Sequence, residues 1–108
     1  MANTFKSAAT GSRTDLLTLY TCPAATTAVV HAIYLSNVDG TNDATVNVSI
    51  SGSANFTDRR YILKTVDIPA DSTVVVEKPI NLSAGDKLET QASANDDVDV
   101  FASILEMT

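Results

Sequence analysis

Turn-forming residues divide this chain, from Asp15 to the C-terminus, into short segments that recur at intervals of about ten residues. Val, Ile, Thr and Tyr gather between the turns, which is the composition of β-strands. No connection is long enough to hold the crossover helix that two parallel neighbours would need. The pattern therefore predicts an all-β, antiparallel, jelly-roll-like β-sandwich of about seven or eight strands, with a small barrel as the alternative.

Alternation along the strands predicts which side chains form the core. Residues 44–51 place Val46, Val48 and Ile50 on one face, and residues 98–107 alternate in the same way. Residues 26–36 are apolar on both faces, with His31 on the face of Val29 and Ile33. The predicted core consists of Leu19, Val29, Ile33, Val48, Ile50, Leu63, Val75, Leu88, Val100 and Ile104.

The length of 108 residues is that of one domain. Residues 1–14 show neither strand nor helix periodicity, so we expect an extended N-terminal arm there and a single β-sandwich domain over residues 15–108. A core of this size stabilises a lone chain only modestly. Symmetric self-association compensates for such a core, and we expect a homo-oligomer, specifically a trimer.

Charge narrows the range of partners. Thirteen acidic residues against seven basic ones give a formal net charge of -6, which repels phosphate backbones and anionic lipid. No apolar run approaches the length of a membrane-spanning helix. We therefore expect neither nucleic acid nor a membrane as a partner.

One cysteine and one histidine limit the available chemistry. Cys22 alone excludes an internal disulfide and a cysteine cluster for zinc. His31 lies in the middle of a strand, and no nucleophile motif places Cys22 beside it. The four glycines are isolated and begin no phosphate-binding loop. We expect no catalytic residues, no cofactor and no small-molecule substrate, so the protein is not predicted to be an enzyme.

Two acidic turns contain the oxygen ligands that calcium prefers. They hold Asp39, Asn42 and Asp43, and Asp96, Asp97 and Asp99. Neither turn has the spacing of a calcium-binding loop, and acidic turns are common on solvated surfaces. We therefore predict no metal site.

Five residues are predicted to contact a partner subunit. Phe5 is an apolar anchor in the N-terminal arm, flanked by the positive charges of Lys6 and Arg13. Arg59 and Arg60 form the one cluster of positive charge, which suits an acidic surface such as another copy of this chain. The alternative for Arg59 and Arg60 is that they protect a solvated strand edge from aggregation.

Four segments carry a family resemblance. They are MANTFKSA at residues 1–8, LYTCPAATTAVVHAIYLSNVDG at 19–40, IPADSTVVVEKPINLSAGDKLETQAS at 68–93 and VDVFASILEMT at 98–108. Together they resemble small β-sandwich structural proteins that tailed phages of cyanobacteria and other aquatic bacteria encode. The chain departs from the family pattern at Asp71, where glycine is frequent, and at Cys22 beside Pro23.

The resemblance implies a non-enzymatic virion structural protein, made in the host cytoplasm without a signal peptide. We expect a multi-copy capsid decoration or cement protein, or a tail or neck component, with copies of itself and other virion proteins as partners. The alternative is a receptor- or carbohydrate-binding head module of a tail fibre, which exposed aromatic side chains around residues 37–43 would favour.

Overall fold

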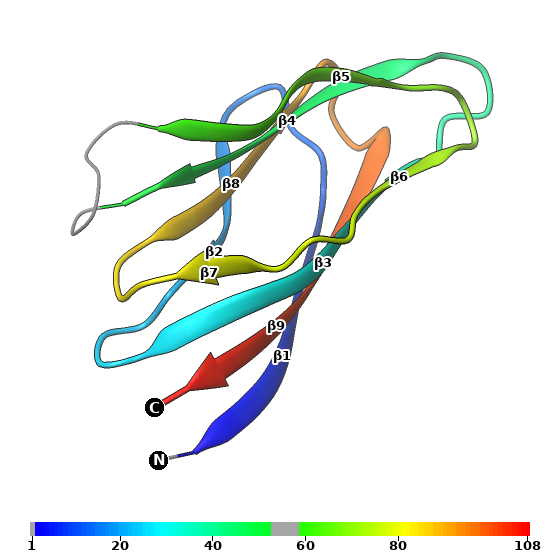
Figure 1. Cartoon of the computed structure of the whole chain (residues 1–108). Coiled ribbons are helices and arrows are strands. Elements are labelled where there is room, and N and C mark those ends of the chain that lie inside the picture. The colour runs from blue at the N-terminus through cyan, green and yellow to red at the C-terminus, as the bar shows by residue number, and fades with distance from the viewer. Residues whose placement is uncertain (1, 53–58) are drawn as a thin grey trace.

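Antiparallel β-strands make up the regular structure of this protein, a computed structural model that describes residues 2–52 and 59–108 (Figure 1). The strands in these two ranges are β1 (Asn3–Gly11), β2 (Leu17–Thr21), β3 (Thr27–Asn37), β4 (Ala44–Ser51), β5 (Arg60–Ile68), β6 (Thr73–Val76), β7 (Ile80–Leu82), β8 (Lys87–Ala92) and β9 (Val98–Met107). No helix in the described part of the chain is long and apolar enough to cross a membrane.

The strands form two sheets that face each other (Figure 1). Sheet A has the order β1-β9-β3-β6, with β7 also pairing to β3, and sheet B has the order β2-β8-β4-β5. This is the strand order of a jelly roll, in which β6 and β7 share one position because Pro79 interrupts the chain between them. The predicted antiparallel, jelly-roll-like sandwich is confirmed.

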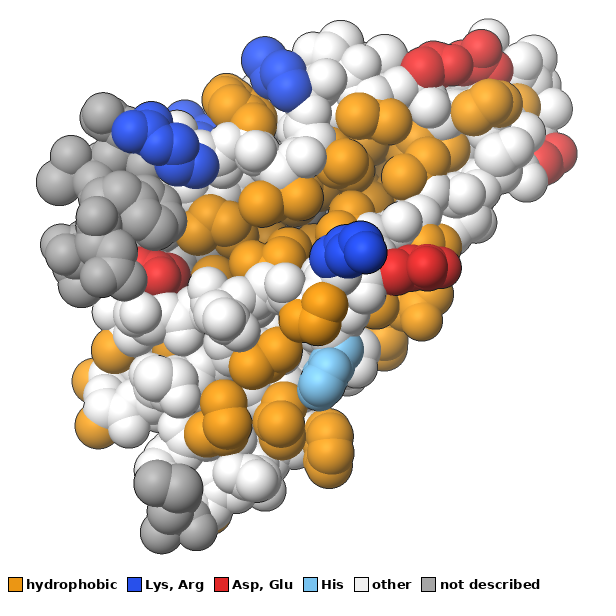
Figure 2. All heavy atoms as spheres, in the orientation of Figure 1, with side chains coloured by type: hydrophobic (Ala, Val, Ile, Leu, Met, Phe, Trp, Pro, Cys, Tyr) orange, Lys and Arg blue, Asp and Glu red, His pale blue; other side chains and the backbone are white. Residues whose placement is uncertain are grey.

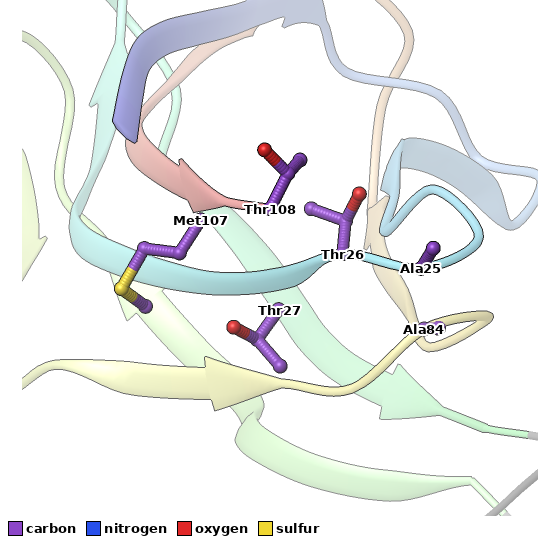
Figure 3. Close-up of a pocket in the computed structure, with 6 residues that line it drawn as sticks. All are labelled: Ala25, Thr26, Thr27, Ala84, Met107 and Thr108. Carbon is purple, nitrogen blue, oxygen red and sulfur yellow. The ribbon is translucent and has the colours of Figure 1, made fainter. Parts of the chain in front are cut away.

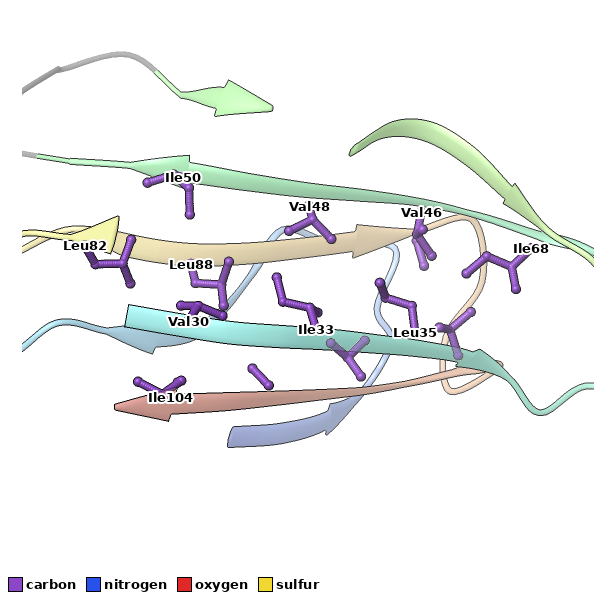
Figure 4. Close-up of a cluster of buried hydrophobic side chains, with 14 of the residues drawn as sticks. Val30, Ile33, Leu35, Val46, Val48, Ile50, Ile68, Leu82, Leu88 and Ile104 are labelled. Carbon is purple, nitrogen blue, oxygen red and sulfur yellow. The ribbon is translucent and has the colours of Figure 1, made fainter. Parts of the chain in front are cut away.

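The core lies between the sheets and is aliphatic. Val30, Ile33 and Leu35 of β3 point toward Val48 and Leu88 of sheet B, and all five are fully buried (Figure 4). Burying an aliphatic side chain of this size contributes about 1.5–3 kcal/mol. The predicted core residues Ile33, Val48, Ile50, Leu88, Val100 and Ile104 are confirmed as buried, and Leu19 and Leu63 pack against the core while partly buried.

A β-bulge at His31 changes which face of β3 points inward. The register of β3 against β9 shifts between Val30 and Ala32, so that His31 is an extra residue in the ladder. The extra residue reverses the alternation, and Val30 is therefore buried together with Ile33. The predicted burial of Val29 is wrong for this reason: Val29 lies on the outer face of sheet A and is partly exposed.

The predicted burial of Val75 is also wrong. Val75 pairs with Tyr34 of β3 on the outer face of sheet A, and 37% of Val75 is exposed. Val74 and Val76 pack against the core instead. Three consecutive valines contain no alternation from which the inward-facing residues can be chosen.

The N-terminal segment differs from the arm that residues 1–14 were expected to form. β1 pairs with β9 in unbroken register, from Asn3 opposite Met107 to Gly11 opposite Asp99. Ala8 on β1 packs against the core. The inward-facing side chains of β1 are small or polar, so the strand lacks the apolar alternation that marks the other strands. β1 is an edge strand of the sandwich and not a segment outside it.

The turn between β5 and β6 contains Asp71, a position at which the resemblance leads us to expect glycine. The backbone of Asp71 is left-handed, with a φ of 58°. Glycine adopts this conformation without steric cost, and aspartate is among the few other residues that tolerate it. The aspartate therefore preserves the turn that glycine would form.

Candidate interaction surfaces

Phe5 and Lys6 are neighbours on β1 but point to opposite faces of sheet A. Phe5 lies opposite Leu105 on the outer face, and 78% of it is exposed. Lys6 lies opposite Ile104 on the inner face, and its Nζ is 3.2 Å from Oε1 of Glu106. Phe5 is available to a partner, whereas Lys6 is engaged within its own chain.

Glu106 is a nearly buried carboxylate that contacts two other strands. Its Oε2 accepts a hydrogen bond of 2.5 Å from the hydroxyl of Tyr20 on β2, and its Oε1 faces Lys6 on β1. The hydrogen bond from Tyr20 holds the pKa of Glu106 below its ordinary value, and Lys6 adds to this against the opposing effect of burial. Burial and the same hydrogen bond raise the pKa of Tyr20. Glu106 lies on β9 of sheet A and Tyr20 on β2 of sheet B, so the hydrogen bond between them links the two sheets.

Arg59, like Lys6, is paired within its own chain, whereas Arg60, like Phe5, is exposed. Arg59 Nε donates a hydrogen bond of 3.0 Å to Oε1 of Glu89, whose side chain is only 7% exposed. This carboxylate holds the pKa of Arg59 above its ordinary value. Arg60 is exposed, and within the described residues its guanidinium meets no carboxylate, only the carbonyl of Arg59 at 3.4 Å. Arg60 therefore keeps its charge available to a partner.

Arg13 follows β1 and lies beside the turn that precedes β9. Its Nη1 is 4.0 Å from Oδ2 of Asp96, and more than half of each side chain is exposed. An exposed pair at this distance contributes less than about 1 kcal/mol. The side chain of Arg13 is therefore only loosely held by its own chain.

The outer face of sheet A carries exposed and partly exposed apolar side chains that we call the outer patch. It consists of Phe5, Val29, Tyr34, Val75, Phe101 and Leu105. The strand register arranges them in two rows, Phe5–Leu105–Val29 and Phe101–Tyr34–Val75. The rings of Tyr34 and Phe101 lie 6.3 Å apart. Figure 2 shows hydrophobic side chains gathered on the lower part of the molecule, where β1, β3 and β9 run in Figure 1.

Sequence reasoning missed the outer patch because β3 was read as alternating without a bulge. With the bulge at His31, Val29 joins Tyr34 on the outer face. Tyr34 and Phe101 already stood at outward positions of their strands in the sequence pattern, so they were the signal from which part of the patch could have been found.

A second apolar region lies between β5 of sheet B and β6–β7 of sheet A. The partly buried side chains there are Leu63, Val66, Val74, Val76 and Ile80. No described strand joins β5 to β6 or β7. Figure 2 shows a band of hydrophobic side chains between these strands. Lys64 lies on β5, with its Nζ 4.9 Å from the centre of the Tyr61 ring, and Lys78 precedes β7.

An open cavity of about 470 Å³ lies beside the C-terminus (Figure 3). It is lined by Ala25, Thr26, Thr27, Ala84, Met107 and Thr108. These side chains provide methyl groups and hydroxyls but no carboxylate, imidazole or amine. The side chains that line the cavity therefore offer no acid or base. Its residues come from three distant parts of the sequence, which is why sequence reasoning did not predict it.

His31 and Cys22 occupy different environments. His31 is exposed at the bulge of β3, whereas Cys22 is 1% exposed and its Sγ donates a hydrogen bond of 3.3 Å to the carbonyl of Thr26. Burial raises the pKa of the Cys22 thiol, and Glu106 adds to the effect, so the reactive thiolate is disfavoured. Within residues 2–52 and 59–108, no three His, Cys, Asp or Glu side chains form a group that could hold a metal ion.

The acidic loop between β3 and β4 uses its oxygens to order its own backbone. Nδ2 of Asn37 donates to the carbonyls of Asn42 and Ile68, each at 2.9 Å. The carboxylate of Asp39 accepts hydrogen bonds from the amides of Thr41 and Asn42. These bonds lower the pKa of Asp39. The acidic residues of this loop thus have a structural role.

Comparison with known proteins shows that the fold is similar to that of a chain in a phage capsid structure. No family model matches the sequence, and no curated protein matches it. Among solved structures, a chain of the "Acidic stable capsid structure of Helicobacter pylori bacteriophage KHP30" is similar, with a TM-score of 0.57 and 17% sequence identity. The match covers 100% of this chain and 89% of that chain. The likeness shows that the two chains share a fold over almost their whole length.

Proposed function

We propose that this protein is a structural component of a phage particle, present in many copies as a capsid decoration or cement protein. The observation that carries the proposal is the full-length structural match to a chain of a phage capsid. Because the match covers 89% of that chain, the likeness is between two small chains and not with one domain of a large shell protein. This favours an accessory position on the shell over a position in the tail or neck.

The fold and the sequence support the same proposal independently. Viral capsid proteins are among the main users of the jelly roll, together with lectin domains and cupins. The segments that resemble phage structural proteins extend over most of the chain. A virion protein would reach the particle by assembly with other phage proteins.

The surface suits a protein that contacts neighbours on a lattice. The outer patch and the region between β5 and β6–β7 are both apolar, and contiguous apolar surface marks protein–protein contacts. Lys6 and Arg59 neutralise carboxylates of their own chain. Of the five residues predicted from the sequence to contact a partner, Phe5, Arg13 and Arg60 therefore remain as the candidate contacts to other virion proteins.

Quantitative mass spectrometry of purified phage particles tests the proposal. We expect the protein to co-purify with the shell in a copy number comparable to that of the shell subunits, while non-structural phage proteins from the same lysate are removed. Phe5→Asp should lower incorporation, because it places a charge in the outer patch. Val38→Asp, which adds the same charge to another exposed apolar residue, is the matched control. Absence from the particle despite abundance in the lysate would contradict the proposal.

A carbohydrate-binding head of a tail fibre is the second candidate. It is favoured by the exposed Tyr34 and Phe101, since aromatic rings stack on sugars and lectin domains also use the jelly roll. The two rings are inclined at 53° to each other, however, and residues 37–43 contain no aromatic side chain. A glycan array decides between the candidates: saturable binding that Tyr34→Ala abolishes would favour the fibre head.

A further inference from the structure

Three of the four sheet edges are short, irregular or interrupted by proline, and β1 is not. The one inward-pointing charge on β1, Lys6, is neutralised by Glu106 of its own chain. β2 has only five residues and a register shift against β8. β5 has two register shifts against β4 and a left-handed residue, Thr65, with a φ of 53°. β6 and β7 are separated by a segment that contains Pro79, which has no amide hydrogen. β1 has nine residues, unbroken register, no proline and no left-handed residue.

The hydrogen-bonding phase of β1 shows which of its backbone groups face outward. Ala2 and Thr108 exchange two backbone hydrogen bonds, and the amide of Ser12 donates to the carbonyl of Val98. In an antiparallel ladder bonded pairs alternate with non-bonded pairs, so the even-numbered residues of β1 bond to β9. The odd-numbered residues, Asn3, Phe5, Ser7, Ala9 and Gly11, direct their amides and carbonyls toward the free edge, where no described strand pairs.

We propose that β1 pairs with β1 of a second copy of this chain, antiparallel, about a two-fold axis at Ser7. This register places Ser7 opposite Ser7, Phe5 opposite Ala9 and Asn3 opposite Gly11, so every outward-facing residue meets another outward-facing residue. Five bonded pairs with two hydrogen bonds each give about ten new ladder hydrogen bonds. Sheet A of each copy continues into sheet A of the other.

The side chains are compatible with this register on both faces. On the outer face, the large Phe5 of one copy lies opposite the small Ala9 of the other copy. Ala9 in turn lies opposite Phe101 of its own chain. The pairing therefore joins the Phe5 row of one outer patch to the Phe101 row of the other. On the inner face Lys6 lies opposite Ala8, so no like charges meet, and Glu106 already neutralises Lys6. A two-fold contact needs a self-complementary surface, and this strand provides one.

The inference goes beyond the proposed function, since it concerns the isolated protein and holds whether or not the protein enters a particle. It predicts a dimer in place of the trimer expected from the sequence, because antiparallel pairing of two identical edges closes with two chains. Loss of the dimer would leave the virion proposal standing, and absence from particles would leave the dimer standing.

Cysteine cross-linking of the purified full chain tests the register. In a bonded antiparallel pair the Cα atoms are about 5.5 Å apart, within the range of a disulfide, so mild oxidation of Ser7→Cys should give a covalent dimer. Ser103→Cys is the matched control, because Ser103 lies opposite Ser7 on the same face of its own chain. Across the dimer the two Ser103 residues are three strand spacings apart, about 14 Å, and should not cross-link. The buried native Cys22 should not interfere.

Ser7→Pro separates pairing from folding. The Ser7 amide faces the free edge, so proline there removes no hydrogen bond to β9 but blocks the second copy. Light scattering of the native chain should give twice the chain mass of 11.4 kDa, and Ser7→Pro should give a single chain mass with unchanged circular dichroism. Three results would overturn the inference: a native chain that stays monomeric at high concentration, equal cross-linking of the Ser7 and Ser103 variants, or an oligomer that Ser7→Pro leaves intact.

Discussion

At the scale of single residues, two of the predicted partner contacts pair with carboxylates of their own chain. Lys6 and Arg59 were predicted to contact a partner because they are positive charges on an acidic chain. Their acidic partners, Glu106 and Glu89, come from other strands. Only the strand register brings these charges together, and short-range sequence patterns do not contain it. Phe5 differs from both, because 78% of it is exposed and it stays a predicted partner contact.

The hydrogen bond from Tyr20 to Glu106 predicts a stability difference that depends on pH. The pKa of Glu106 is lower in the folded chain than in the unfolded chain, so its contribution is fully present above the unfolded value of about 4.3 and is lost as pH falls through the folded value. Tyr20→Phe should therefore lower the melting temperature by about 5 °C near neutral pH, and by progressively less below about pH 4.

Thermal unfolding followed by circular dichroism between about pH 3 and pH 7 measures this difference. Tyr34→Phe is the matched control, because the Tyr34 hydroxyl is on the exposed outer face and should contribute little at any pH. A gap between the Tyr20→Phe variant and the native chain that stays constant across this range would show that Glu106 is not the partner.

At the scale of strands, the sequence predicted the elements that alternate clearly and missed two that do not. β3, β4 and β9 were recognised from their alternating aliphatic residues and flanking turns. β7 has three residues after Pro79, too few to show a period. β1 was missed because it lies at the rim of the sandwich, where the inward-facing positions are filled by small or polar side chains and show no apolar alternation. A β-bulge also cannot be predicted from composition, since the extra residue His31 leaves the composition of its strand unchanged.

The bulge at His31 predicts opposite outcomes for two adjacent substitutions. Val30→Asp places a charge in the fully buried core and should abolish soluble folding. Val29→Asp places the same charge on the outer face and should cost only about 1 kcal/mol. Urea unfolding of the soluble variants measures the difference. Without the bulge the strand would bury Val29, and the Val29 variant would be the one that fails to fold.

At the scale of the whole molecule, β1 belongs to the folded unit. An arm outside the sandwich could be removed without loss of stability, whereas deletion of residues 2–11 leaves one edge of β9 unpaired and removes Ala8 from the core. We expect the deletion to lower the free energy of unfolding by about 3 kcal/mol or more. The comparison is made with the monomeric Ser7→Pro chain, so that loss of the dimer does not contribute. An unchanged urea midpoint would return residues 1–14 to the status of an arm.

A reconstruction of the intact phage particle by electron cryo-microscopy tests the proposed role most directly. We predict density for this two-sheet sandwich repeated over the capsid lattice, with Phe5 and the outer patch in contact with neighbouring subunits. The same sandwich repeated only in the tail or neck would keep the structural role and correct the position. A particle that is complete and infectious without such density, from a phage whose lysate contains the protein, would contradict the virion role itself.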